Sequence, residues 1–228
     1  MESVLISFEI KITFNSNKIE DRFISDFGLS FLIYNNFTEN YLLFDTGSNS
    51  ETLIHNIEQF DIDVSEISKI IISHNHFEHK GGLDGVYKKN NNVEIYVPTE
   101  NLISYKRKYP KSRIIGVSDK MLIEKNIYST GQLGNYLKEQ AIFLKTEGDE
   151  LIALVGCCHP GLDEIISIGK TIGNIKAIIG GFHGIRRFGC LEGIDFIGAT
   201  HCTQHLDLLK LRFPDQFKNI HVGDSLVF

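Results

Sequence analysis

The side chains and spacing of residues 73–79 are those of a metal site. This segment reads Ser-His-Asn-His-Phe-Glu-His and is followed, after one lysine, by two glycines. Neutral imidazole nitrogens and a carboxylate are good ligands for zinc, iron or manganese. In extended backbone, side chains at i and i+2 point to the same side, so we expect His74 and His76 to bind one ion together. We expect Glu78 and His79 to reach a second ion, where the chain turns into the glycines.

Other histidines have similar places in the sequence. The segment 69–72 before the motif is apolar and has the pattern of a buried strand. Three histidines follow comparable apolar runs: His159 after 151–156, His183 after 177–181 and His201 after 196–200. Taken alone, each is explained as an ordinary buried histidine. Together they indicate strands that deliver ligands to one edge of a sheet, with the chemistry in the loops beyond.

These placements predict how the ligands divide between ions. One ion is expected to be held by three imidazoles, those of His74, His76 and His159. A second is expected beside a mixed set, Glu78, His79 and His201, with His183 nearby. A bound divalent ion lowers the pKa of its water toward about 7 and makes hydroxide available. Glu78, if it is not a ligand, can accept a proton from that water. Glu78 and His183, which lies near the second ion, are the candidate catalytic residues.

The motif also resembles a known family. Ser-His-x-His-x-Asp-His-x-Gly-Gly-Leu is the signature of the metallo-β-lactamase superfamily, and residues 73–83 are similar to it. Further segments resemble its dihydropterin/ribofuranosylaminobenzene-phosphate synthase-like branch, namely 28–33, 43–47, 156–161, 180–183, 201–203 and 222–228. The resemblance covers nearly the whole chain, least clearly 100–140. It implies an α/β fold, a four-layer αββα sandwich of two mixed sheets packed face to face with helices outside, and a metal-dependent hydrolase.

The chain departs from the family pattern at three positions. Glu78 stands where the superfamily usually has an aspartate, and its side chain is one methylene longer. His183 occupies the slot in which the superfamily usually has an aspartate that bridges two metals. A single imidazole nitrogen cannot bridge in that way, so one ion, or two ions bridged only by water, is expected. Phe27 stands where the branch often has histidine.

Composition limits the class of protein. The 228 residues, with 42% hydrophobic and 23% charged residues, are expected to form a single domain over 1–228. A net charge of −6 argues against nucleic-acid binding. The basic stretch 106–113 is interpreted as the solvated end of a surface helix, or alternatively as an anchor for an anionic substrate. Charged residues interrupt the first apolar stretch, so we expect neither a signal peptide nor a membrane span, and the oligomeric state stays open.

The four cysteines, at 157, 158, 190 and 202, form no disulfide pattern. We interpret them as reduced thiols of a cytoplasmic protein. Cys202 adjoins His201, and it is either a small buried hydrophobic residue or a metal or redox group.

The coarse pattern is one of strands interleaved with helices. Strands are expected at 4–14, 28–34, 41–45 and 93–97, and a hairpin at 140–146 and 150–156. A helix capped by Ser48 or Ser50 is expected to run to about Phe60. Further helices are expected from Pro98 to about Lys108, from about Leu162 to Gly169, and from Gln204 to Phe213 with Thr203 as the cap. Asp45 is expected either to orient a ligand histidine or to bond its own turn.

The function expected first is hydrolysis of a phosphoester or cyclic phosphodiester, because a two-metal edge and a helix N-terminus suit anionic oxygens. The alternatives are hydrolysis of a lactone, thioester or amide, and a non-catalytic metal-binding scaffold with a decayed site. The expected cofactor is one or two divalent ions, with zinc first and manganese, iron or nickel as alternatives. The expected partner is a small anionic substrate, with no nucleic acid and no membrane.

Overall fold

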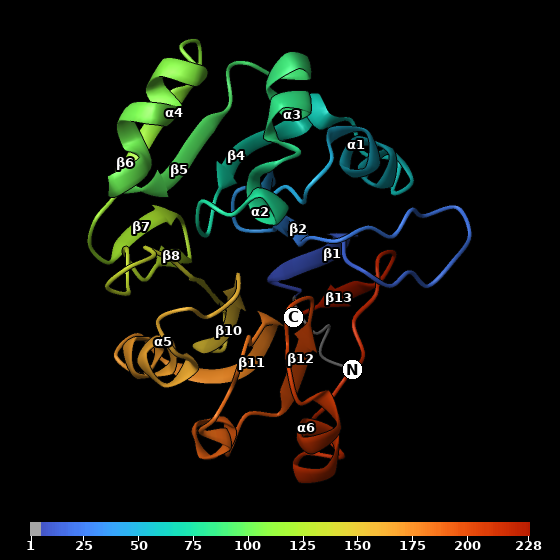
Figure 1. The fold of residues 1–228 in the computed structure, drawn as a ribbon, viewed down its shortest axis with the longest axis vertical. Coiled ribbons are helices and arrows are strands. Elements are labelled where there is room, and N and C mark those ends of the chain that lie inside the picture. Colours follow the sequence, from blue (N-terminus) through green and yellow to red (C-terminus); the bar gives the residue numbers. More distant parts are fainter. Residues whose placement is uncertain (1–5) are drawn as a thin grey trace.

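A computed structural model describes residues 6–228, whose strands form two sheets (Figure 1). The first sheet has the order β13-β1-β2-β3-β4-β5-β6. Its strands are β1 (Phe8–Phe14), β2 (Ser30–Asn35), β3 (Asn40–Phe44), β4 (Ile67–Ile71), β5 (Glu94–Pro98), β6 (Arg113–Val117) and β13 (Ser225–Val227). The second has the order β12-β11-β10-β9-β8-β7. Its strands are β7 (Met121–Glu124), β8 (Ile127–Ser129), β9 (Ile142–Lys145), β10 (Glu150–Val155), β11 (Asn174–Gly181) and β12 (Phe196–Thr200).

Helices lie on the outer faces of the two sheets (Figure 1). The first sheet carries α1 (Ser50–Glu58), α3 (Leu83–Lys89) and α4 (Leu102–Lys108), with the short α2 (Phe77–Lys80) and the 3-10 turns η1 (Val64–Glu66) and η2 (Thr99–Asn101). The second carries α5 (Leu162–Gly169), η3 (Phe188–Leu191) and α6 (Leu206–Arg212). The predicted four-layer αββα sandwich is therefore confirmed.

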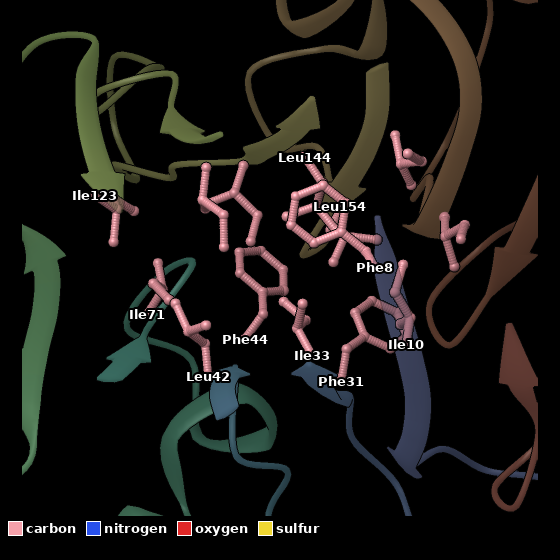
Figure 2. Packing of buried hydrophobic residues seen from close by; sticks show 14 of the residues in the cluster. Phe8, Ile10, Phe31, Ile33, Leu42, Phe44, Ile71, Ile123, Leu144 and Leu154 are labelled. Carbon is pink, nitrogen blue, oxygen red and sulfur yellow. The ribbon is translucent and has the colours of Figure 1, made fainter. Parts of the chain in front are cut away.

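The main hydrophobic core lies between the two sheets (Figure 2). Phe8, Phe31 and Phe44 project from the first sheet toward Leu144 and Leu154 of the second, and all five are fully buried. Two further cores lie under the outer helices. Strands in the middle of such a sandwich are covered on both faces and need continuous apolar runs rather than alternation, as β10 shows with Leu-Ile-Ala-Leu-Val.

Parallel pairing brings the predicted site segments to one edge. In the first sheet β3, β4, β5 and β6 are parallel neighbours, and in the second β10, β11 and β12 are. The carboxyl ends of parallel strands meet at the same edge of a sheet. The loops that leave β4, β10, β11 and β12 there carry the histidines that the sequence singles out.

Two predicted helix starts are wrong in detail. The first helix is capped by Asn49, whose Oδ1 accepts from the N–H groups of Glu51 and Thr52, whereas the Ser50 hydroxyl contacts Gly82 and Gly85. The last helix begins at Leu206 rather than at Gln204.

Thr203 is therefore not a cap. Its hydroxyl donates to the Thr200 carbonyl and accepts from the Phe182 N–H, so it ties β12 to β11.

The predicted helix from Pro98 is divided into η2 and α4. The predicted strand 4–14 begins at Phe8 in the structure, and residues 4 and 5 lie outside the described part of the chain. Among residues 6–228, no helix is long and apolar enough to cross a bilayer.

Candidate metal centre

The first predicted ligand set comes together at the edge between the two sheets. His74 and His76 follow β4, and His159 follows β10. One ring nitrogen of each lies within 4.8 Å of the others, and Nε2 of His74 is 3.0 Å from Nδ1 of His76. His74 is fully buried, whereas the side chain of His76 is 44% exposed. The first ligand set is thus buried at His74 and open to solvent at His76.

The second predicted set also converges. Ligand atoms of Glu78, His79 and His201 lie within 4.8 Å of one another, and the rings of His79 and His201 are 4.9 Å apart. The Glu78 carboxylate lies 3.8 Å from Nδ1 of His76. Glu78 therefore sits between the two groups, where it can serve as a ligand or as an acceptor for a proton.

Two thiols and the ring of His159 surround His183. Its ring is 4.9 Å from that of His159, and its ligand atom groups with the sulfurs of Cys157 and Cys202. His183 is exposed and follows β11, which lies between β10 and β12. It therefore connects the first ligand set to a pair of thiols.

Asp45 has the orienting role that was one of its two sequence interpretations. Its Oδ2 lies 2.6 Å from Nδ1 of His79 and accepts from the Ser73 hydroxyl, and its Oδ1 accepts from the Ser73 N–H at 2.6 Å. Nδ1 of His79 must carry the hydrogen and donate it to Asp45, because a carboxylate oxygen can only accept. The Nε2 lone pair of His79 is then free to bind a metal.

Ser73 sets the tautomer of the neighbouring histidine in the same way. Its hydroxyl hydrogen is directed to Asp45, so the oxygen accepts from Nδ1 of His74 at 2.9 Å. Nε2 of His74 is therefore the unprotonated nitrogen, and it faces the other ligands. The buried Asp45 carboxylate thus fixes two imidazoles, that of His79 directly and that of His74 through Ser73.

Glu139 holds the third histidine in place, and sequence reasoning missed it. Its Oε1 accepts from the N–H groups of Cys157 and Cys158, at 2.8 and 2.9 Å, and its Oε2 accepts from that of His159 at 2.9 Å. Burial raises the pKa of Glu139 to about 7, although the three backbone donors act in the opposite direction. No local signal marked it, because Glu139 is one of four acidic residues in the segment 100–140, where the family resemblance was least clear.

The residues present fit a divalent metal. Within residues 6–228, Nε2 of His159 and both ring nitrogens of His201 are buried without a hydrogen-bond partner. Such groups are costly unless an unseen ligand satisfies them. Burial, assisted by neighbouring imidazoles, lowers the pKa of His79 and His201 to about 3 and that of His159 to about 4. The imidazoles of His79, His159 and His201 are therefore neutral near pH 7, the state that binds a metal.

Comparison with known proteins now decides the family. Residues 25–150, more than half of the chain, match the metallo-beta-lactamase superfamily. The chain belongs to this superfamily. It is 28% identical to the 7,8-dihydropterin-6-methyl-4-(beta-D-ribofuranosyl)-aminobenzene-5'-phosphate synthase of Methanocaldococcus jannaschii, over 90% of this chain and 91% of that protein. The resemblance to the synthase-like branch is therefore confirmed.

Solved structures share the fold. A metal-dependent hydrolase of the beta-lactamase superfamily matches with a TM-score of 0.81 at 21% identity, covering 96% of this chain and 98% of the other. A diphosphatase from the PhnP family matches with a TM-score of 0.57 at 12% identity, covering 97% of each chain. These likenesses establish the sandwich, and superfamily membership implies a divalent metal at its edge.

A cavity of about 710 Å³ lies beside the candidate ligand histidines. It is bordered by His159 and His183 and extends along the loop that carries Arg186 and Arg187. Phe27 is 56% exposed, and its ring lies 5.0 Å from that of His201. The position that departs from the branch pattern therefore places an aromatic ring over a candidate ligand.

Proposed function

We propose that this protein is a metal-dependent hydrolase that acts on phosphoester bonds, including those of cyclic phosphodiesters. The observation that carries this proposal is the cationic lining of the cavity next to the imidazoles. Arg186 and Arg187 both line it. Guanidinium groups recognise phosphate oxygens better than they recognise a neutral ester.

The charges in the cavity leave one arginine available. Arg187 pairs with Asp163 at 3.0 Å, whereas Arg186 forms no ion pair within residues 6–228 and is exposed. The first turn of α5 also lines the cavity: Gly161 is its N-cap, and Gly161 provides no side-chain cap. The free N–H groups of a helix start favour an anion.

The chemistry divides among the residues of the edge. A divalent ion bound by the imidazoles would supply an activated water and would polarise a phosphoryl oxygen. Glu78 is placed to take up a proton at its carboxylate, and His183 is placed at the cavity border to donate a hydrogen bond from a ring N–H to a leaving oxygen. Arg186 would orient the substrate phosphate. Zinc is the ion we favour, because imidazole suits it.

The relatives give further support. The archaeal synthase is named for a compound that carries a 5'-phosphate, and a protein of this fold is described as a diphosphatase. Both descriptions concern phosphorylated compounds, which suits an arginine-lined cavity. A small anionic substrate of this kind is therefore the partner we propose.

A substrate screen tests the proposal. Purified protein with zinc or manganese is assayed against phosphomonoesters, bis(4-nitrophenyl) phosphate, cyclic nucleotides, lactones and thioesters. We expect turnover of one of the phosphate classes, its loss in His76→Ala, and a raised KM in Arg186→Ala. Arg212→Ala, an exposed arginine on α6, is the matched control and should leave KM unchanged.

The opposite results are equally informative. Turnover of lactones or thioesters with inert phosphoesters would overturn the substrate class and favour the alternative hydrolase. Bound metal without turnover of any class would favour a metal-binding scaffold.

A further inference from the structure

Two thiols meet at the same edge as the imidazoles. Cys157 follows β10, Cys202 follows β12, and His183 follows the strand between them. The two sulfurs and one ring nitrogen of His183 all lie within 4.8 Å of one another. Three neighbouring parallel strands therefore each deliver one metal-ligating side chain to a single point.

Cys157 links this group to the rest of the centre. Its Sγ lies 3.1 Å from Sγ of Cys202 and 3.1 Å from Nε2 of His79. It also groups with His74 and His79 as a possible ligand set. The Cys157 sulfur is thus shared between the fully buried imidazoles and the exposed His183.

The local backbone makes room for these sulfurs. A Cβ at Gly181 would lie 2.5 Å from the Gly156 carbonyl oxygen and 2.6 Å from Sγ of Cys202, so glycine at this position leaves the space in which Cys202 approaches Cys157. The Glu139 carboxylate fixes the Cys157 N–H at 2.8 Å. Cys157 is 2% exposed, which limits the positions its sulfur can adopt.

On the basis of the metal-dependent function above, we propose that Cys157, Cys202 and His183 form a third ligand group of this centre, one that binds a divalent ion through thiolate sulfur. Cys157 then supplies a shared ligand in a chain that lacks the usual bridging aspartate. Each thiol that binds releases its proton to solvent, and no electrons are transferred. Thiolate ligands favour zinc, cobalt(II) or cadmium over magnesium and manganese.

Cobalt(II) substitution tests this directly, because a cobalt–thiolate bond gives a strong near-ultraviolet charge-transfer absorption that imidazole and carboxylate ligands do not give. We expect the band in the wild type, its weakening in Cys157→Ser and in Cys202→Ser, and its loss in the double variant. Cys190→Ser is the matched control, because the Cys190 thiol donates to the Arg187 carbonyl and lies outside the group. Its spectrum should equal that of the wild type.

Elemental analysis of the same samples separates the two proposals. Cobalt bound to the wild type without a charge-transfer band overturns the thiolate group and leaves the metal-dependent hydrolase standing. No bound metal in the wild type overturns both.

A second measurement avoids serine variants, which could fail to fold. Wild-type protein, kept reduced, is alkylated with iodoacetamide with and without zinc, and the modified cysteines are identified by peptide mass spectrometry. Zinc should slow modification of Cys202 and Cys157 and leave that of Cys190 unchanged. Equal rates at Cys202 with and without zinc would overturn the thiolate group.

Discussion

The carboxylate of Glu139 accepts a hydrogen bond from the backbone N–H of His159 at 2.9 Å. The same carboxylate accepts from the two preceding N–H groups. One side chain thereby fixes the loop that presents a candidate ligand, from a position twenty residues earlier in the chain.

Replacing this carboxylate should weaken metal binding. In Glu139→Gln the side-chain NH₂ faces backbone donors, so at least one N–H loses its acceptor and His159 loses its fixed position. We expect zinc affinity to fall roughly 10- to 100-fold, the usual size of an outer-shell effect. Isothermal titration with zinc measures it. Glu147→Gln, at an exposed turn, should bind as the wild type does, and an unchanged affinity in Glu139→Gln would contradict the orienting role.

Asp45 should affect the second ligand group more than the first. Asp45→Asn keeps the shape of the side chain but weakens the charge-assisted bond to His79. We expect loss of the ion beside Glu78, His79 and His201, with the ion beside His76 and His159 retained. Metal content per chain after dialysis is the measurement. Asp26→Asn, on the exposed surface, serves as the control. Full metal content in Asp45→Asn would contradict the expectation that Asp45 supports the second ligand group.

Phe27 should act on the substrate rather than on the metal. Its ring is 56% exposed and lies against His201, so its removal costs little in the folded core. An aromatic contact is worth about 0.5–1.5 kcal/mol, so Phe27→Ala should raise KM roughly 2- to 10-fold and leave metal content unchanged. Steady-state kinetics with the best substrate of the screen tests it. Leu211→Ala, 79% exposed on α6, is the control, and a selective loss of kcat would contradict this role.

The ion pair between Glu124 and Lys69 should make stability depend on pH. Glu124, on β7, also accepts from Asn35 and Thr38 and so joins the two sheets. Burial alone would raise the pKa of Glu124, but the bonds from Lys69, Thr38 and Asn35 outweigh it and lower the pKa below its ordinary value of 4.5. A lowered pKa stabilises the fold above 4.5, and this contribution is lost as the pH falls through the folded value.

Urea unfolding of Glu124→Gln tests that link. The free energy of unfolding should fall by about 2 kcal/mol at pH 7, and the difference from the wild type should shrink steadily below pH 4.5. Glu147→Gln should have the same free energy of unfolding as the wild type at pH 7 and below pH 4.5. A difference that grows toward acid pH would show that Glu124 is not stabilised as the carboxylate.

The layers of the fold and most of the imidazole cluster could be predicted from the sequence. His74 and His76 belong to one short motif, and His159 and His201 each follow an apolar run, so local pattern places them at strand ends. The parallel pairing of those strands then brings them together. Helix starts were less predictable, because Asn49, Ser48 and Ser50 are all capping residues and tertiary contacts decide among them.

The parts that could not be predicted depend on long-range contacts. Glu139 acts on N–H groups across a hairpin, and its own segment carries no recognised pattern. Cys157 meets Cys202 across a strand that lies between theirs, and their sequence separation gives no sign of it. His183 follows its strand as expected, but a left-handed backbone, with φ of 39°, directs it toward His159 and the thiols.

The pairing of β1 with β13 has a consequence for synthesis of the chain. Phe8 exchanges backbone hydrogen bonds with Phe228 at 3.0 Å in both directions, so the first and last strands among residues 6–228 lie side by side. During translation the first sheet keeps an unpaired edge at β1 until residues 225–228 have left the ribosome. An exposed strand edge invites pairing with other chains, so nascent chains stalled before this point should be especially dependent on chaperones.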